Sequence, residues 1–326
     1  MILVTGGTGF LGSHLVRKLV AHGQQVRALY RNAQSIPADL KESVEWVPCD
    51  ILDTIGLDEA MQNISVVYHT AAIVSFEARH LSQMYDVNVR GTANVVNAAL
   101  ATGVKKLVHV SSIAALGRME GSQVITEKTV WQETDNNSKY AITKFKAELE
   151  VRRGIEEGLP SIIVNPSVII GEGNWTQGTG RFFSMVRNGF RFYPIGVNGF
   201  VSVHDVVECM IRFMNSPIQN ERFILNGENI SYRTFFTLIT NTYQVPQPQY
   251  RLSPIPVKGL RYLSDMIHLI LRTSPFLTRE TANTVNHIYK YSNEKASNTL
   301  NFQFEKADVF VIRTANKFIE YLRSHS

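Results

Sequence analysis

Three glycines near the start of the chain have the spacing of a phosphate-binding turn. Gly6, Gly9 and Gly12 follow the apolar stretch Ile2–Val4 and precede a helical pattern. Glycine lets the chain turn tightly, lets backbone amides approach a pyrophosphate, and lets the helix pack closely on the sheet. The first helical turn then offers unpaired N–H groups and the positive end of its dipole to phosphates. The sequence therefore predicts a dinucleotide site, with an ordinary strand-to-helix turn as the plain alternative.

The end of the second predicted strand, Gln25–Tyr30, bears on which dinucleotide binds. An NAD site usually places Asp or Glu there to hold the ribose 2′-hydroxyl. This chain has Tyr30 and Arg31 instead, and no acidic residue before Asp39. A guanidinium pairs with a 2′-phosphate and stacks on adenine, so NADP is the favoured cofactor. NAD stays an alternative, in which case Arg31 is a solvated surface side chain.

A tyrosine and a lysine four residues apart could move a proton. Tyr140 and Lys144 lie on one face of a predicted helix, one loop after the strand that ends in Ser111 and Ser112. With 12 tyrosines in the chain, roughly 0.5 Tyr-x-x-x-Lys matches are expected by chance, so the spacing alone is a weak signal. A second copy begins at Tyr291, far beyond the last predicted strand of the sheet. We reject that copy as a catalytic pair.

The Tyr140–Lys144 pair suits carbonyl reduction by a nicotinamide. Hydride transfer to a carbonyl leaves alkoxide charge that must be protonated. A phenol with a pKa of ~10 needs that pKa lowered by ~3 units, which corresponds to about 4 kcal/mol. An ammonium at ~4 Å in an effective dielectric of ~20 contributes an energy of that size. We expect Tyr140 to be the general acid/base, and Lys144 to lower its pKa and hold the nicotinamide ribose; satisfied hydroxyls on a cap or loop are the alternative.

Strand and helix patterns alternate through the first half of the chain and would position these residues. The alternation predicts a doubly wound parallel Rossmann sheet with helices on both faces, whose ligands bind at the carboxyl ends of the strands. We expect residues 1–171 to form this α/β dinucleotide-binding domain and residues 201–226 to return to it. Residues 172–200 and 227–326 are expected to form a smaller mixed α/β substrate domain. The further predicted strands are Val44–Pro48, Val66–Thr70, Lys106–Val110, Ser161–Asn165 and, returning to the main sheet, Phe200–Val203.

Short motifs cover roughly the first 170 residues in a fixed order. They are Thr5–Gly12, Asp50-Ile51, Ala71-Ala72, Asn88–Thr92, Ser111-Ser112, Tyr140 with Lys144, and Pro166-Ser167. Together they resemble an extended short-chain dehydrogenase/reductase, the group that also holds the NAD-dependent epimerase/dehydratase family. The strand Val26–Arg31 is similar to the dihydroflavonol-reductase and 3β-hydroxysteroid-dehydrogenase branch. The stretch at Asn165 departs from the arginine-containing strand of many nucleotide-sugar enzymes, which weakens the case for a sugar-nucleotide substrate.

The resemblance implies roles that spacing alone leaves open. Ser112 is expected to bind the substrate oxygen, because the family serine stands five residues before a glycine, here Gly117; Ser111 is the alternative. Asn88 corresponds to an asparagine that stabilises the central helix and joins a proton relay, with a simple N-cap as the alternative. The cofactor contacts implied by the motifs are Gly6, Thr8, Gly9, Phe10, Leu11, Gly12, Arg31, Asp50, Ile51, Ala71, Ala72, Tyr140, Lys144 and Pro166.

Beyond Gly171 the sequence is rich in aromatic residues. These rings either line a cleft for a hydrophobic or aromatic substrate or fill the small domain's own core. His204 is expected to be structural, because it has no partner at metal-ligand spacing, and no metal site is expected. The stretch Leu260–Leu277 is apolar but interrupted by charges, and we expect a helix of the substrate domain, with a peripheral membrane contact as an alternative. The aromatic residues are Trp175, Phe182, Phe183, Phe190, Phe192 and Tyr193.

The composition predicts one well-packed chain. Its 326 residues are 44% hydrophobic, with no uninterrupted apolar run of ~18 residues, so no integral membrane segment is expected. The first strand begins at once, so no leader is expected. Cys49 and Cys209 are the two cysteines, which suits the cytoplasm. A net charge of +5 without a basic tract gives no case for nucleic acid as a partner. The resemblance implies a homodimer through helices at Asn94–Leu100 and Lys139–Arg153.

Three functions fit these observations. The first is an NADP-dependent oxidoreductase that interconverts a ketone and a secondary alcohol on a medium-sized, apolar or aromatic substrate. The second is an NAD-dependent epimerase or dehydratase of nucleotide sugars, which uses the same residue types but returns its hydride within one turnover. The third is a non-catalytic redox sensor, and retention of both Tyr140 and Lys144 argues against it.

Overall fold

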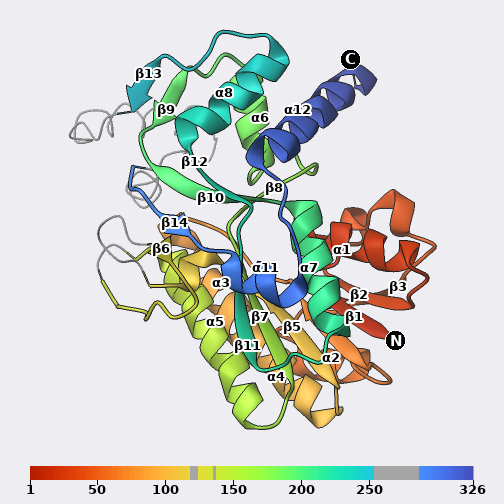
Figure 1. Cartoon of the computed structure of the whole chain (residues 1–326). Helices are drawn as coiled ribbons and strands as arrows, with labels where there is room; N and C mark the ends of the chain where they lie inside the picture. Colours follow the sequence, from red (N-terminus) through yellow and green to blue (C-terminus); the bar gives the residue numbers. More distant parts are fainter. Residues whose placement is uncertain (118–123, 135–136, 253–285, 326) are drawn as a thin grey trace.

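The structure is a computed structural model, and it describes residues 1–117, 124–134, 137–252 and 286–325 (Figure 1). The helix expected at Leu260–Leu277 lies outside these residues. Within them, none of the helices combines the length and the apolar character needed to cross a bilayer.

A parallel sheet of seven strands forms the larger part of the molecule. Its strand order is β11-β7-β5-β4-β1-β2-β3, so the chain winds outward in both directions from the boundary between β1 and β4. The register places Val4 opposite both Ala28 and Tyr68. The doubly wound Rossmann sheet expected from the sequence is therefore confirmed. The strands are β1 (Ile2–Thr5), β2 (Val26–Tyr30), β3 (Glu45–Pro48), β4 (Val66–His69), β5 (Lys106–Val110), β7 (Ser161–Pro166) and β11 (Glu221–Leu225).

Helices cover both faces of this sheet, and each face has its own apolar core. Leu3 and Val4 enter opposite cores because successive side chains of a strand point to opposite faces. Helices α1, α7 and α11 cover the Val4 face, while α2, α4 and α5 cover the Leu3 face. The helices are α1 (Phe10–Ala21), α2 (Thr54–Ala60), α3 (Leu81–Tyr85), α4 (Gly91–Ala101), α5 (Lys139–Glu156), α7 (Val203–Asn215) and α11 (Glu294–Leu300). Short helical turns are η1 (Ala33–Ser35), η2 (Ala38–Leu40), η3 (Ala78–His80), the π-helical η4 (Asp86–Arg90) and η5 (Ile113–Ala115).

The smaller part lies beyond the carboxyl edge of the large sheet (Figure 1). Its three-stranded sheet has the order β12-β10-β8, in which β10 runs parallel to β8 and antiparallel to β12. Helices α8 and α12 pack together, and their apolar faces form a separate core around Phe235 and Phe310. The elements are β8 (Val168–Ile170), α6 (Gly180–Arg187), β9 (Phe192–Pro194), β10 (Val197–Ser202), β12 (Glu228–Ser231), α8 (Tyr232–Tyr243), β13 (Tyr250–Leu252) and α12 (Ala307–Ser324), with β6 (Val124–Ile125) pairing to β14 (Lys290–Tyr291).

Two parts of the chain lie elsewhere than the sequence suggested. The expectation that Phe200–Val203 rejoins the main sheet is wrong, because β10 pairs with β8 and β12. It is β11 that extends the large sheet beside β7, since α7 follows β10 directly and leads into β11 as a helix–strand unit. Helix α11 packs against β11 and α7, so a segment expected in the substrate domain covers the large sheet instead.

Candidate active site

The glycine turn between β1 and α1 is shaped so that side chains are excluded from it. Gly6 has a φ of +71°, and a Cβ there would lie 2.7 Å from the Ala71 amide nitrogen. A Cβ on Gly12 would lie 2.1 Å from the Gly6 carbonyl oxygen. Gly9 caps α1 without a side-chain hydrogen bond, so the amides of the first turn face outward unclaimed by a cap. The turn therefore has the open cradle that a pyrophosphate requires.

A cleft opens over this turn at the carboxyl ends of β1, β2 and β4. It gathers many of the residues that the motifs implied as cofactor contacts: Gly6, Thr8, Gly9, Arg31, Asp50, Ile51, Ala71 and Ala72. Those that do not line it are Phe10, Leu11, Gly12, Tyr140, Lys144 and Pro166. Residues that line it without having been expected are Leu29, Tyr30, Cys49, Thr70, Ile73 and Val87. Thr70 directly follows β4, and its position at a strand end was a signal that could have identified it.

Arg31 and Asp50 face each other at the β2 and β3 end of this cleft. The guanidinium Nη1 lies 3.8 Å from the Asp50 Oδ2, and the two side chains are 58% and 41% exposed. An ion pair this long and this exposed contributes little stability. The Arg31 guanidinium is therefore held loosely, whereas the Asp50 carboxylate also accepts a hydrogen bond from the Leu52 amide at 3.0 Å.

The proposed acid lies at the start of α5, whose first turn is fixed by a cap. The Ser138 hydroxyl accepts a hydrogen bond from the Ala141 amide at 3.1 Å, and the helix begins at Lys139. This brings Tyr140 to the loop after β5, where its phenol shares a hydrogen bond with the Ser112 hydroxyl. The Phe76 ring packs against Tyr140 with centroids 6.0 Å apart. A phenol, a hydroxyl and an apolar ring thus meet at one point.

The electrostatics of Tyr140 differ from the expectation. Burial raises the pKa of the Tyr140 phenol, and the hydrogen bond with Ser112 opposes this only in part. The Lys144 Nζ donates to the Val110 carbonyl at 2.9 Å, and burial has the largest effect on the pKa of the phenol. With its pKa raised, the phenol keeps its proton at neutral pH, the state a general acid needs.

Lys144 is itself strongly perturbed. Its side chain is 1% exposed, and burial lowers the pKa of the ammonium to about 8, while the Glu148 carboxylate acts in the opposite direction. Glu148 lies one helical turn after Lys144, so Tyr140, Lys144 and Glu148 share one face of α5. The four-residue spacing of all three is visible in the sequence and could have identified Glu148 as part of the site.

Glu148 anchors a buried polar cluster beneath the site. Its Oε1 accepts hydrogen bonds from the Ser111 hydroxyl and the Asn165 amide, both at 2.6 Å, and its Oε2 lies 3.3 Å from the Arg222 guanidinium. The Ser111 hydroxyl therefore uses its hydrogen in the bond to the Glu148 carboxylate. Ser112 points the other way, toward Tyr140, and this geometry favours it over Ser111 as the group that meets the substrate.

Asn88 links the cofactor cleft to α5. Its amide nitrogen donates to the Ile73 carbonyl at 2.9 Å and to the Thr143 hydroxyl at 3.1 Å, and its Oδ1 accepts from the Ile73 amide. The alternative of a simple N-cap is wrong, because the helical path begins at Leu81 and runs through the π-helical turn η4. Asn88 therefore fixes the position of the Ile73 backbone, which lines the cleft, relative to α5, the helix that carries Tyr140.

Two buried histidines lie beneath the same region. His69 bonds to Thr5 and Thr92 through its two ring nitrogens, and burial lowers its pKa to about 3. The His109 ring packs 5.1 Å from it, and its pKa is also lowered well below the usual value by burial. Within the described residues neither nitrogen of His109 has a hydrogen-bond partner. Both imidazoles stay neutral at physiological pH and add no charge beside Lys144.

The second Tyr-x-x-x-Lys copy, Tyr291 and Lys295, makes structural contacts away from the candidate active site. The Lys295 ammonium pairs with Glu221 at 2.7 Å and donates to the Arg222 carbonyl, at the far end of β11. Tyr291 is buried, and its carbonyl accepts from Asn226 and Asn229. The pair serves the packing of β14 and α11 on the large sheet.

The aromatic residues beyond Gly171 fill a core. Trp175 and Phe183 are buried, and Phe182, Phe190 and Tyr193 pack on the same cluster. Phe192 is the exception, since it is exposed and contacts the Tyr250 ring in a tilted arrangement, with centroids 5.4 Å apart. The alternative in which these rings line a substrate cleft is not supported, because the small domain needs them for its own interior.

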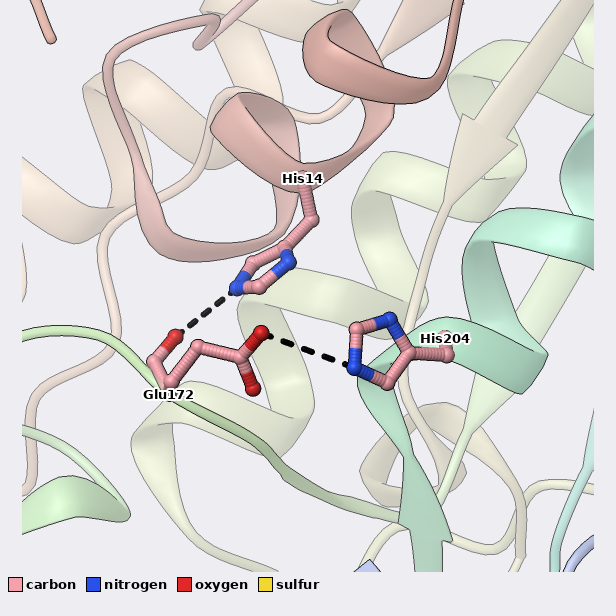
Figure 2. A group of neighbouring side chains, drawn as sticks. All are labelled: His14, Glu172 and His204. Atoms are coloured by element: carbon pink, nitrogen blue, oxygen red, sulfur yellow. Dashed lines mark hydrogen bonds and ion pairs between the residues drawn. The ribbon is translucent and has the colours of Figure 1, made fainter. Parts of the chain in front are cut away.

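His204 has partners that sequence spacing did not reveal. Its Nε2 lies 3.5 Å from the Glu172 Oε1, and the His14 Nε2 donates a hydrogen bond to the Glu172 backbone carbonyl at 2.7 Å (Figure 2). The three ligand atoms that these residues offer lie within 4.8 Å of one another. The expectation that His204 has no partner at metal-ligand distance is wrong, because the partners are distant in sequence.

The fold and the site define an NAD(P)-dependent enzyme of the extended short-chain dehydrogenase/reductase class. The matching family model, the NAD dependent epimerase/dehydratase family, covers residues 2–225. The chain belongs to this family.

Known relatives agree with this class. The chain is 31% identical over 265 residues to sterol demethylase protein B of Methylococcus capsulatus, covering 81% of this chain and 80% of that protein. It is 33% identical over 257 residues to a Synechocystis protein named as a dihydroflavonol 4-reductase, covering 76% and 73%. The crystal structure of gox2253 matches with a TM-score of 0.83 at 30% identity, over 100% of this chain and 98% of that one.

Proposed function

We propose that this protein is an NADPH-dependent reductase that converts a ketone to a secondary alcohol on a medium-sized apolar substrate. The observation that carries the proposal is the protonated Tyr140 phenol, hydrogen-bonded to Ser112 and placed one helical turn before Lys144. A neutral phenol beside a second hydroxyl is suited to bind a carbonyl oxygen and then protonate it.

The chain's own residues fit a bound dinucleotide. The open cradle at the glycine turn would hold the pyrophosphate, and Asp50 would accept from the adenine amino group. When bound, the nicotinamide supplies the hydride that attacks the carbonyl carbon. Ser112 and Tyr140 orient the carbonyl oxygen, and Tyr140 transfers its phenolic proton to that oxygen as negative charge develops. Solvent then reprotonates the phenol, which balances the reaction.

The choice of NADPH is supported by Arg31. Its guanidinium lines the cleft after β2, where no carboxylate of β2 is available for a ribose 2′-hydroxyl. It is 58% exposed, and its contact to Asp50 is long, at 3.8 Å, so it is available to pair with a 2′-phosphate.

An apolar substrate is supported by the surroundings of Tyr140 and by relatives. The Phe76 ring lies against Tyr140, so an apolar surface adjoins the proposed acid. Relatives carry the names of a sterol demethylase protein and a dihydroflavonol 4-reductase. Both names refer to ring systems with large apolar areas.

The test is to supply the purified protein with NADPH or NADH and a panel of cyclic and aromatic ketones, alongside UDP-sugars. We expect NADPH oxidation to accompany alcohol formation in equal amounts, with NADPH preferred. Interconversion of a UDP-sugar without net change in cofactor would overturn the proposal and favour the epimerase or dehydratase alternative. Cofactor binding with neither activity would favour the redox sensor.

The homodimer implied by the resemblance stays a prediction. Helices α4 and α5 pack side by side, and Leu149 on α5 is 46% exposed. Light scattering of the wild type and of Leu149→Glu tests it. A dimer that the substitution converts to a monomer supports pairing through α5, and a wild-type monomer contradicts it.

A further inference from the structure

A cluster of two histidines and one glutamate lies away from the catalytic tyrosine. His14 is in the second turn of α1, Glu172 follows β8, and His204 is in the first turn of α7. Figure 2 shows the three side chains converging from three separate elements, with the Glu172 carboxylate between the two imidazole rings. His14 and Glu172 are 158 residues apart in the sequence, so only the fold brings them together.

The geometry places three metal-ligating groups within reach of one ion. The His204 Nε2 lies 3.5 Å from the Glu172 Oε1, the His14 and His204 ring centroids are 5.6 Å apart, and the three candidate ligand atoms all lie within 4.8 Å of one another. Zn–N bonds of ~2.0–2.1 Å at tetrahedral angles put ligand atoms about 3.3 Å apart. The cluster must therefore contract by about 1.5 Å at its widest.

The side chains are free enough to make that adjustment. The His204 and Glu172 side chains are 45% and 36% exposed, so each has room to rotate. The backbone beneath them is firm. Gly171 and Gly173 flank Glu172 and pack so closely on Phe10 and Val203 that a Cβ at either would collide. The ligands thus project from fixed elements, as a preformed site requires.

The protonation states also favour a cation. The His14 Nε2 donates to the Glu172 carbonyl, so the neutral ring carries its lone pair on Nδ1, and that nitrogen is the one able to bind an ion. The Glu172 carboxylate is an anion at neutral pH and lies 3.5 Å from the His204 ring. Metal binding requires neutral imidazole and ionised carboxylate. Arg17 and Arg313 bring positive charge nearby, which the carboxylates of Asp39 and Glu305 offset by pairing with them.

We propose that His14, Glu172 and His204 form a binding site for a divalent transition metal, with zinc as its principal ligand. Two imidazoles and one carboxylate are a donor set that suits zinc, cobalt and nickel better than calcium or magnesium. Three protein ligands leave a fourth position for water. The ion would fasten α1, the β8–α6 loop and α7 to one another.

This site is distinct from the proposed reductase chemistry. Tyr140 and Lys144 lie on α5, on the opposite face of the large sheet from α1 and α7. The ion would stabilise the packing of α1 against its neighbours, and the first turn of α1 also forms part of the glycine turn proposed to hold the cofactor. The inference therefore stands or falls without reference to the substrate.

The experiment is a titration of the metal-free full chain with Co²⁺, read by its visible absorption, and with Zn²⁺, read by calorimetry. The variants are His204→Gln and Glu172→Gln, with His22→Gln as the matched control. His22 lies exposed at the end of α1, away from the cluster. Glu172→Gln keeps the shape of the side chain and removes its charge, so it remains informative if His204→Gln fails to fold.

We expect one Co²⁺ and one Zn²⁺ per chain in the wild type and in His22→Gln. Binding should be weaker by about 100-fold or more in either ligand variant, because loss of a ligand costs at least as much as loss of its supporting hydrogen bond. Zn²⁺ should raise the thermal unfolding midpoint of the wild type and the control only. The proposal is overturned if the wild type binds no stoichiometric metal, or if Glu172→Gln binds it as the wild type does.

Discussion

The charged groups at the two ends of the catalytic region differ in burial, and this difference sets what each can do. On α5, Lys144 and Glu148 are each 1% exposed, and the carboxylate contacts Ser111, Asn165 and Arg222. At the β2 end of the cofactor cleft, Arg31 and Asp50 are largely exposed and 3.8 Å apart.

The buried charges on α5 and the exposed Arg31–Asp50 pair therefore have different roles. A buried charge is strongly coupled to its neighbours. Lys144 and Glu148 on α5 therefore fix the positions of the groups around them and shift the pKa values of those groups. An exposed pair is screened by water, so it adds little to stability and stays free to meet a ligand. We therefore expect substitutions on α5 to have large effects on turnover and stability, and substitutions at Arg31 to have small effects confined to cofactor choice.

The largest effect is expected from Tyr140→Phe. Removing the phenolic proton should lower kcat by about 10³- to 10⁴-fold while NADPH affinity stays within a few-fold, because general acid catalysis contributes about that much and the aromatic ring remains. Turnover and fluorescence titration measure the two quantities. Tyr85→Phe, exposed on α3, is the control. Unchanged turnover in Tyr140→Phe removes this residue from the mechanism.

The free energy of unfolding of Glu148→Gln should test the role of the buried charges on α5. The substitution leaves the Arg222 guanidinium without its ionic partner, and breaking a buried pair costs about 3–5 kcal/mol. Urea unfolding measures the loss. Glu150→Gln on the same helix breaks a half-exposed pair with Arg153 and should cost less than about 1 kcal/mol. Equal losses in the two variants would contradict the contrast drawn between buried and exposed pairs.

The pH dependence of stability sharpens the same contrast. Lys144 has a pKa of about 8 in the folded chain and ~10.4 when unfolded. Between these values the unfolded chain binds more protons, so this group's contribution to the free energy of unfolding rises with pH, by at most about 3 kcal/mol. Lys144→Met should abolish that rise between pH 8 and 10, measured by urea unfolding. The exposed Lys146→Met should keep the wild-type slope, and a wild-type slope in Lys144→Met would refute the assignment.

The smallest effect is expected from Arg31→Glu. Loss of one exposed charge-assisted contact should weaken NADPH binding about tenfold, which corresponds to ~1.4 kcal/mol, and leave NADH binding nearly unchanged. The free energy of unfolding should change by less than about 0.5 kcal/mol. Parallel titrations with both cofactors measure this. An equal loss for NADPH and NADH would show that Arg31 does not read the 2′-phosphate.

Much of the large domain could be predicted because its signals are local. The glycine turn, the alternation of strands and helices, and the Tyr140–Lys144 spacing each depend on residues a few positions apart. The first strand, the first helix and the Ser-bearing strand end appear within a residue or two of where the pattern predicts them. The placement of β10 could not be predicted in this way, because sheet partners are chosen by long-range packing.

The sequence by itself determined the class of fold, the cofactor turn and the family, since these follow from short-range spacing and glycine stereochemistry. Only the tertiary structure decided which of two adjacent serines contacts Tyr140, because the Glu148 carboxylate on α5 accepts the hydrogen bond of Ser111 while Ser112 bonds to the phenol. It also decided the direction of the Tyr140 pKa shift and the meeting of His14 with His204. Burial and contact are properties of the packed chain, and no local pattern encodes them.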